Sequence, residues 1–423
     1  MIPDADLKGP MLRKIPIDQL VPGMYVEQLD RSWLLVPVFR NPIASGDQVR
    51  KLKEWDVREV VIDTDKGIDS PAAAPGPATG PASGPAGRPD PVPYEVELSG
   101  ANTIYEEALD SVSRMMDAVR NGEKPDVALA DATVDELIGS VLRNRDALAS
   151  LLSLKEHSDA TFQHCVRVCI LTLVFCTRLG FARSESKSVG IGALLHDIGK
   201  TQLPLALVEK QTPYEAEEFQ DYRTHPLLGA QLFDQASGIE KRSLLVLLQH
   251  HERSDGSGFP QGLVKDEISR MASMVMIVDT YDNLTTGRQG KARMTPYEAL
   301  QWIRQWGGPG FDAHLVDEFV SALGLYPVGS FVRLSDHRLG IVLAVHHNPA
   351  LLPKVWVVFD ARHRMLPEGE TIDMAHQPSS NPLSIVTSLL PQKLGFDLPG
   401  YVRERGLLTG PVPEPEPETR HIS

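Results

Sequence analysis

The sequence predicts a mainly α-helical protein with a small α+β domain on its N-terminal side and a small β appendage toward its C-terminus. Apolar residues return every three or four positions through most of residues 98–325, which is the period of an amphipathic helix. Before this region the chain has short β-branched runs around one helical stretch, and after Tyr326 apolar and polar residues alternate as in strands. At 423 residues the chain has room for one principal domain and smaller ones.

The predicted α+β domain spans residues 13–67. Its β-branched runs, Met24–Val26 and Val57–Ile62, are typical of strands. Between them Ser45 and Gln48 match a capping box that precedes apolar residues at helical spacing. The domain carries no cluster of catalytic side chains, so regulation and dimerisation are the roles that we consider for it.

Residues 68–97 connect this domain to the helices. Up to about residue 92 they are almost all Ala, Pro, Gly and Ser. Such a composition buries too little apolar surface to offset its ordering entropy. We therefore predict a flexible linker.

The helical region has its clearest periodic runs at Ile104–Val119, Val134–Leu152 and Phe162–Leu179. We divide it into a helical connector, residues 98–150, and a main helical domain, residues 151–325. The connector has two interpretations, a dimer-forming bundle or helices that pack within their own chain.

The C-terminal region is expected to form strands. Alternating or β-branched runs occur at Phe331–Leu334, Ile341–Val345 and Val355–Phe359. These runs predict a small β appendage over residues 326–375. Residues 409–423 alternate Pro and Glu and are predicted to be a disordered tail.

The composition excludes some classes of function. A formal net charge of −14 argues against broad binding to nucleic-acid polymers or anionic membranes, because both depend on basic patches. An anionic ligand therefore needs cations that are placed locally. The sequence has no secretory signal pattern after Met1 and no run of 18 or more apolar residues, so we expect a cytoplasmic protein.

The three cysteines, Cys165, Cys169 and Cys176, lie in one apolar stretch. They lack the CxxC spacing of a zinc site, so we predict buried structural thiols.

A series of histidines and aspartates runs through the main helical domain. Its members are His164, His196, Asp197, His225, His250, His251, Asp279 and Asp282. Imidazoles and carboxylates together suit iron, manganese, nickel or zinc, whereas calcium prefers oxygen ligands and structural zinc sites usually include cysteine. The series therefore indicates a catalytic transition-metal centre.

Apolar runs lead directly into several of these residues. Ala193–Leu195 precede His196, Leu244–Leu248 precede His250, and Met274–Val278 precede Asp279. Polar groups at the ends of apolar helices are costly to bury without a metal or hydrogen-bond partners. A single core histidine is more often hydrogen-bonded than metal-bound, but the whole series in this order favours the metal.

These motifs resemble those of HD-domain phosphohydrolases, and of the HD-GYP subgroup in particular. The H…HD…D signature is matched by His164, His196-Asp197 and Asp279. The subgroup's motifs are matched by His196–Lys200, His225-Pro226, His250–Arg253, Asp255-Gly256, Gly258–Pro260 and Gly310–Asp312. The resemblance covers about residues 140–325 and implies an all-α HD-type helical bundle. The segment Leu20–Met24 is similar to a domain of uncharacterised role that often precedes HD-GYP domains.

The resemblance implies a metal-dependent phosphodiesterase that hydrolyses cyclic di-GMP (c-di-GMP) to pGpG, GMP or both. It implies two divalent transition-metal ions, iron or manganese first, with nickel or zinc as alternatives. The implied metal ligands are His164, His196, Asp197, His225, His250, His251 and Asp279. Asp197 would bridge the ions, and Asp197 and Lys200 would be the catalytic residues.

The resemblance also implies substrate contacts from Lys200, Asp282, Arg288 and Lys291. Arginine suits a phosphate or a guanine because it donates paired hydrogen bonds. Arg288 and Lys291 can instead belong to a solvated surface run. Asp282 can instead orient a metal ligand or cap a helix.

The sequence departs from the subgroup at three places. Phe259 stands where the name motif has Tyr, which removes a hydroxyl group and keeps the ring. Ala160 stands where some members have a Glu that helps to bind a third metal, so a two-metal centre is expected. The segment Gly287–Lys291 lacks the usual Pro and Tyr, which affects substrate affinity more than chemistry.

Two other functions remain open at this point. The chain can be a degenerate c-di-GMP-binding signalling module, or an HD phosphohydrolase that acts on another nucleotide. For partners we expect c-di-GMP, no nucleic-acid polymer and no membrane, with a homodimer or other signalling proteins as further candidates.

Overall fold

The computed structural model describes residues 12–29, 43, 45–54, 57–64, 92–154, 161–233, 238–287, 292–306, 310–345, 352–377 and 382–405. Most of the predicted linker and all of the predicted tail lie outside these ranges. The chain divides into two compact units, Met1–Gly87 and Arg88–Ser423. The domain boundaries of the sequence analysis remain predictions.

The first unit has a three-stranded antiparallel sheet and one helix. Its elements are β1 (Leu12–Pro16), the 3-10 turn η1 (Ile17–Gln19), β2 (Tyr25–Leu29), α1 (Gly46–Glu54) and β3 (Glu59–Asp63). The strand order is β1-β3-β2, so the last strand lies between the other two. Met24, Leu52 and Ile62 are buried in its core.

The second unit begins with helices that build the body of the protein. They are α2 (Tyr94–Arg120), α3 (Val127–Arg143), α4 (Arg145–Leu154), α5 (Thr161–Arg178), α6 (Arg183–Leu195), η3 (Ile198–Gln202), α7 (Leu205–Val208), α8 (Ala216–Tyr222), α9 (His225–Gln231), α10 (Lys241–Gln249), η4 (Lys265–Glu267), α11 (Arg270–Thr286), α12 (Pro296–Trp306) and α13 (Ala313–Leu323). This helix-rich fold agrees with the prediction.

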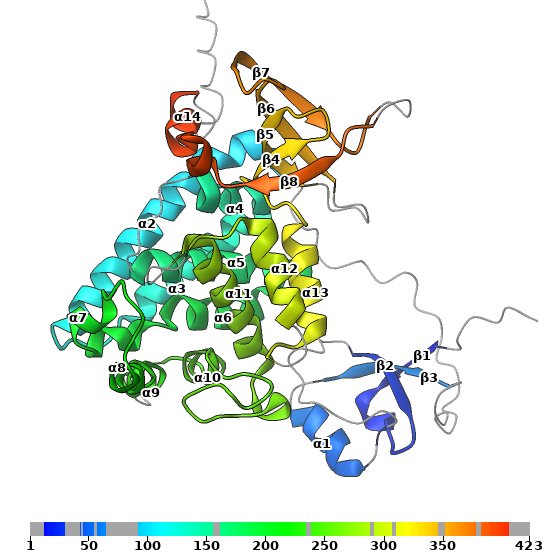
Figure 1. The fold of residues 1–423 in the computed structure, drawn as a ribbon. Coiled ribbons are helices and arrows are strands. Elements are labelled where there is room, and N and C mark those ends of the chain that lie inside the picture. The colour runs from blue at the N-terminus through cyan, green and yellow to red at the C-terminus, as the bar shows by residue number, and fades with distance from the viewer. Residues whose placement is uncertain are drawn as a thin grey trace, which may run out of the picture. The chain divides into compact units, whose positions relative to one another are not determined.

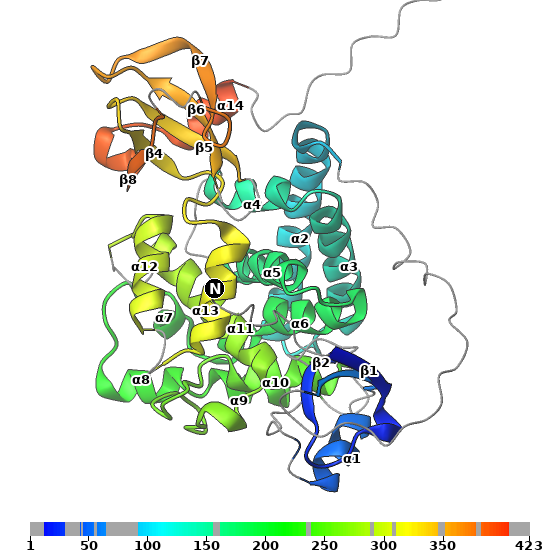
Figure 2. The same cartoon turned by 90° about the vertical axis from the view of Figure 1, so that its right-hand side faces the viewer.

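Helix α5 is the central helix of the body. Every residue from His164 to Cys176 is buried, as expected of a helix that is covered on all sides. Figures 1 and 2 both place α5 among α3, α6, α11 and α13. The prediction of buried thiols is confirmed, because Cys165, Cys169 and Cys176 are free and buried.

One predicted helical run is divided in the structure. The run Val134–Leu152 was expected from a single apolar period, but α3 ends at Arg143 and α4 begins at Arg145. The Oδ1 atom of Asn144 accepts hydrogen bonds from the backbone N–H groups of Asp146 and Ala147. Asn144 therefore starts a new helix, which an apolar period alone does not reveal.

The second unit ends in a five-stranded antiparallel sheet and a short helix. The elements are β4 (Phe331–Leu334), β5 (Leu339–Val345), β6 (Pro353–Phe359), β7 (Met365–Asp373), β8 (Ile385–Leu389), η5 (Pro391–Leu394) and α14 (Leu398–Glu404). The strand order is β7-β6-β5-β4-β8. The sheet continues past residue 375, because β8 pairs with β4. Among the described helices none is long and apolar enough to cross a membrane.

Candidate metal centre

Helices from distant parts of the chain bring all the predicted metal ligands together. One group consists of Asp197, His225, His250 and His251, and another of His164, His196 and Asp279. Within each group one ligand atom from every residue lies within 4.8 Å of the others. The Asp197 Oδ1 atom lies 3.3 Å from His225 Nε2, and Asp197 Oδ2 lies 3.6 Å from His196 Nε2. Asp197 therefore stands between the two groups.

Hydrogen bonds fix which nitrogen of each histidine faces the centre. The Nδ1 atoms of His196, His225 and His250 donate to the carbonyl oxygens of the residues three positions earlier, at 2.7–2.8 Å. His164 Nδ1 donates instead to Asp282 Oδ2 at 2.7 Å. In all four histidines the Nε2 atom is therefore unprotonated, and its lone pair points toward the centre.

These inward lone pairs face one another. The Nε2 atoms of His164 and His196 are 3.3 Å apart, and so are those of His225 and His250. Two unprotonated nitrogens cannot hydrogen-bond to each other, and all four rings are at most 1% exposed. Buried groups of this kind need a partner. A cation between the rings meets that need, so the residues present fit a metal centre.

Two further buried atoms support this fit. Asp197 Oδ1 and His251 Nε2 have no hydrogen-bond partner among the described residues. Burial lowers the pKa values of His196, His225, His250 and His251, which keeps these imidazoles neutral. Neutral imidazole is the form that binds a metal.

Asp197 is held in its charged form. Burial by itself would raise its pKa, but the Lys200 ammonium lowers the pKa of Asp197 well below its usual range. The Lys200 Nζ atom contacts Asp197 Oδ2 and lies 5.1 Å from the ring centroid of Tyr222. The predicted catalytic residues are therefore adjacent, and Lys200 is itself only 7% exposed.

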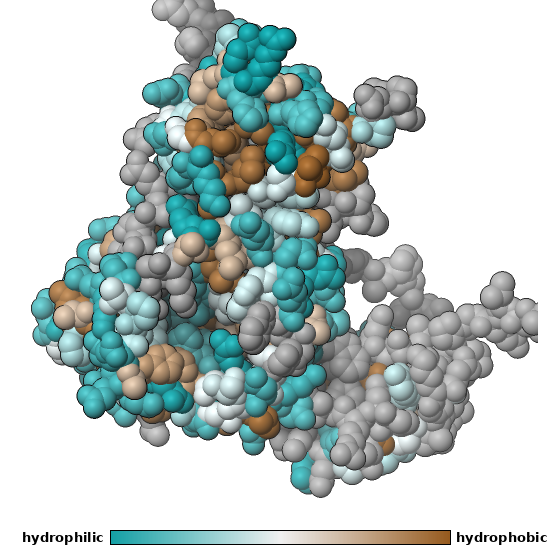
Figure 3. Space-filling view, in the orientation of Figure 1, coloured by the Kyte–Doolittle hydropathy of each residue, from teal (hydrophilic) through white to brown (hydrophobic). Residues whose placement is uncertain are grey.

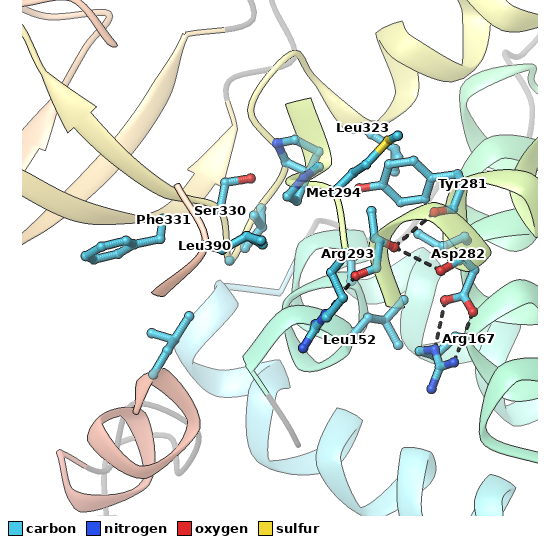
Figure 4. Close-up of a pocket in the computed structure, with 18 of the residues that line it drawn as sticks. Leu152, Arg167, Tyr281, Asp282, Arg293, Met294, Leu323, Ser330, Phe331 and Leu390 are labelled. Carbon is cyan, nitrogen blue, oxygen red and sulfur yellow. Dashed lines mark hydrogen bonds and ion pairs between the residues drawn. The ribbon is translucent and has the colours of Figure 1, made fainter. Parts of the chain in front are cut away.

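Asp282 lies behind His164. Its carboxylate accepts from His164 Nδ1 and from two nitrogens of Arg167, Nε at 2.8 Å and Nη2 at 3.0 Å. Figure 4 shows Arg167 and Asp282 joined by two dashed lines. Both oxygens are thus occupied and the residue is 3% exposed, which corrects the expectation of a direct substrate contact. The geometry matches the alternative, in which Asp282 orients a metal ligand.

Arg167 and Asp282 also line a pocket of about 110 Å³ between the helical body and the C-terminal sheet (Figure 4). Leu152 of α4, Leu323 of α13 and Phe331 of β4 belong to the same lining. None of the predicted metal ligands lines it, so this pocket is separate from the metal centre.

The loop after His251 is held by a buried carboxylate. Glu252 is fully buried, and its oxygens accept from the backbone N–H groups of Gln261 and Leu263 at 2.7 and 2.9 Å. A Cβ atom on Gly258 would lie 2.4 Å from the backbone nitrogen of Arg253, so only glycine fits there. The loop places the ring of Phe259 on the ring of His251, with centroids 4.5 Å apart.

Several predicted residues lie outside the described part of the chain, namely Arg288, Lys291 and Ala160. The proposed substrate contacts of Arg288 and Lys291 therefore remain predictions. Cys165 was expected to be structural only, yet its sulfur lies close to His196 and Asp197.

Two arginines near the centre were missed in the sequence. Arg167 follows His164 by three residues and so shares its helical face, a signal that was available. Arg223 directly follows α8 and comes close to Phe259, a contact that sequence spacing does not indicate.

Comparisons with known proteins agree with this geometry. A family model described as an HD domain matches residues 146–315, and one described as a domain of unknown function matches residues 12–130. The chain is 37% identical over 370 residues to a cyclic di-GMP phosphodiesterase of Pseudomonas aeruginosa, covering 86% of this chain and 89% of that protein. It is 32% identical over 180 residues to the cyclic di-GMP phosphodiesterase response regulator RpfG of Xanthomonas campestris, covering 41% of this chain and 47% of that protein.

Among solved structures, an HD-GYP-type protein from Bdellovibrio bacteriovorus matches 73% of this chain and 98% of its own, with 17% identity and a TM-score of 0.45. The buried His/Asp centre in a helical body defines the class of HD-domain metal-dependent phosphohydrolases. Because the 37% identity extends over 86% of its length, the chain belongs to the HD-GYP family of cyclic di-GMP phosphodiesterases. The resemblance predicted from the motifs is confirmed.

Proposed function

We propose that this chain hydrolyses phosphodiester bonds of c-di-GMP to pGpG, GMP or both, and so lowers the level of this second messenger. The observation that carries the proposal is the set of buried, inward-facing Nε2 atoms around Asp197. A relative that matches most of the chain is named a cyclic di-GMP phosphodiesterase, which supports the choice of substrate.

The proposal includes two divalent transition-metal ions, iron or manganese first and nickel or zinc as alternatives. Asp197, His225, His250 and His251 would hold one, and His164, His196 and Asp279 the other, with Asp197 shared. When bound, the ions supply Lewis-acid activation of water and stabilise charge on the phosphate oxygens. The mixed nitrogen and oxygen ligands suit these metals.

Lys200 would act beside the metals. Its buried ammonium stands next to Asp197, where it can balance negative charge on the phosphate or pass a proton to the leaving oxygen. Arg288 and Lys291 would bind the phosphates or guanines of the ligand. A cytoplasmic location and contacts with a second copy or other signalling proteins also remain predictions from the sequence.

The test combines metal analysis with product identification. Purified protein with iron or manganese should convert c-di-GMP to pGpG or GMP, and the double change His196→Ala with Asp197→Ala should abolish turnover. A matched control is His376→Ala with Asp373→Ala, a histidine and aspartate paired on the C-terminal sheet at 3.1 Å, and it should retain activity. Unchanged turnover in the His196 and Asp197 variant would refute the proposal.

The two alternatives predict different results. An HD phosphohydrolase for another nucleotide would leave c-di-GMP intact and cleave a different member of a nucleotide panel. A binding module would bind c-di-GMP tightly in calorimetry without forming product. The convergence of all the predicted metal ligands argues against a module that only binds, because binding alone does not need a metal centre.

A further inference from the structure

Arg223 is a cation beside the metal centre whose guanidinium has no polar partner within the described part of the chain. Its guanidinium makes no hydrogen bond or ion pair with any described residue, and its contacts are with two aromatic rings. The guanidinium carbon lies 5.3 Å from the ring centroid of Phe259 and 5.9 Å from that of Phe219. In a chain with a net charge of −14, such a cation is a strong candidate for contact with an anionic ligand.

The Phe259 ring connects Arg223 to the metal ligands. It packs on His251 with a centroid distance of 4.5 Å and an interplanar angle of 30°. It also lies 6.2 Å from the ring of His225. A group held next to Arg223 is therefore separated from the metal ligands only by the Phe259 ring. The missing hydroxyl of Phe259 leaves Arg223 with no polar acceptor on that ring.

Phe219 completes an aromatic surface at this position. Phe219 is 42% exposed, so it is accessible to a ligand, and its ring stands edge-on to Phe259 with the ring centroids 6.1 Å apart. Phe219 and Arg223 are four residues apart on and just after α8, so they share one side of that helix. Figure 3 shows brown and tan side chains among teal ones near the place where Figure 1 labels α8.

We propose that Phe219, Arg223 and Phe259 form a shelf that holds a guanine base of the cyclic dinucleotide while its phosphate is at the metal centre. This inference rests on the proposed function and adds a determinant of base specificity. The base would stack on the exposed ring of Phe219, because aromatic rings bind unpaired bases in this way. Arg223 would donate paired hydrogen bonds to guanine O6 and N7, a pair of acceptors that adenine does not offer.

The test compares substrates with and without guanine. Michaelis constants are measured on metal-loaded protein for c-di-GMP, for cyclic di-AMP and for methyl p-nitrophenyl phosphate, a diester without a purine. The variants are Phe219→Ala and Arg223→Gln. The controls are Leu142→Ala, which removes an apolar side chain of the same 42% exposure on α3, and Arg304→Gln on α12. Thermal unfolding checks that every variant is folded.

The expected result is a change in KM with little change in kcat. Phe219→Ala should raise KM for c-di-GMP about 5- to 100-fold, which corresponds to the loss of one base stack. Arg223→Gln should raise it about 10-fold and reduce the preference for c-di-GMP over cyclic di-AMP. Neither change should affect KM for methyl p-nitrophenyl phosphate, and the controls should behave as wild type.

Two outcomes would overturn the shelf. One is an unchanged KM for c-di-GMP in both variants. The other is an equal rise for all three substrates, which would indicate a general contact with phosphate. Absence of c-di-GMP cleavage by the wild type would refute the proposed function instead. Calorimetric Kd values for c-di-GMP would then decide on the shelf, and equal affinity in wild type and both variants would contradict it.

Discussion

Arg167 and Asp282 each lie three residues after a predicted metal ligand on the same helix. On α5, Arg167 follows His164 by three residues, and on α11, Asp282 follows Asp279 by three. Residues at this spacing share a helical face. The two helices therefore contribute the ligands His164 and Asp279 from one turn, and the Arg167–Asp282 pair behind them from the next. The hydrogen bond from His164 Nδ1 to Asp282 sets which nitrogen faces the metal.

Asp282→Asn should weaken metal binding. The amide keeps the shape of the side chain but loses the charge that faces Arg167 and the strong acceptor for His164 Nδ1. We expect the affinity for Mn²⁺ to fall about 10- to 100-fold in calorimetric titration. Asp336→Asn, which changes an aspartate paired with Arg338 at 2.7 Å, is the control and should bind Mn²⁺ normally. Equal affinity in both variants would show that Asp282 does not orient His164.

The stability of the metal-free protein should depend on pH through the ligand histidines. Burial lowers the pKa values of His196, His225, His250 and His251 below those of the unfolded chain, which are about 6.5. At a pH between the folded and the unfolded pKa values, the unfolded chain binds more protons than the folded one. The contribution of the neutral histidines to the free energy of unfolding is therefore fully present above about pH 6.5 and is lost as the pH decreases. The slope is up to about 1.4 kcal/mol per pH unit for each histidine.

Thermal unfolding of chelator-treated protein at several pH values between 5 and 8 measures this effect. The midpoint should drop steadily below about pH 6.5. Added Mn²⁺ should raise the midpoint most at neutral pH, because protons compete with the metal for the same nitrogens. A flat profile without metal would mean that the histidines are not buried as described.

At the scale of elements, η3 and α9 lie so close together that a side chain on Gly199 would not fit between them. A Cβ atom on Gly199 would lie 2.0 Å from the carbonyl oxygen of His225 and 2.4 Å from the nitrogen of Gly229. This contact brings Asp197 and Lys200, at η3, next to His225 at the start of α9. The glycine is therefore needed for packing that assembles the metal centre.

Gly199→Ala should separate these elements. We expect a loss of about 1–3 kcal/mol of stability from overpacking and a much reduced metal content. Gly100→Ala in α2 is the matched control, because a Cβ atom there meets nothing within 4 Å. The control should be neutral or stabilising by about 0.5–1 kcal/mol, since alanine favours helices. Metal analysis and thermal unfolding compare the two, and normal metal content in Gly199→Ala would contradict the argument.

At the scale of the whole molecule, the metal centre belongs to one compact unit. All the predicted metal ligands, Lys200, and the Arg167–Asp282 pair behind them lie within Arg88–Ser423. The C-terminal sheet is part of the same unit and shares a pocket lining with Arg167 and Asp282. The first unit contributes none of these residues.

A chain of residues 88–423 should therefore fold and bind metal on its own. Metal content per chain and the helical circular-dichroism signal should equal those expected from the full protein. A chain of residues 88–325, which lacks the C-terminal sheet, should be less stable, because it exposes the apolar faces of α4 and α12 that contact β5 and β8. Metal-free or unfolded 88–423 protein would contradict the division into units.

Much of this architecture could be predicted from local patterns. The helical period identified α2 and α5, and β-branched runs identified β4, β5 and β6, because residue type and spacing along the chain determine these elements. The junction at Asn144 was missed because a side chain that caps a helix leaves the apolar period on either side intact.

By itself the sequence determined the helix-rich class, the set of histidines and aspartates, and the family, because these depend on the type and order of residues. Only the tertiary structure decided which atoms face one another. Asp282 contacts His164 and Arg167 across 118 and 115 residues, and Phe259 meets His251 through a folded loop. The physical reason is that packing joins distant segments through contacts that local periodicity does not specify.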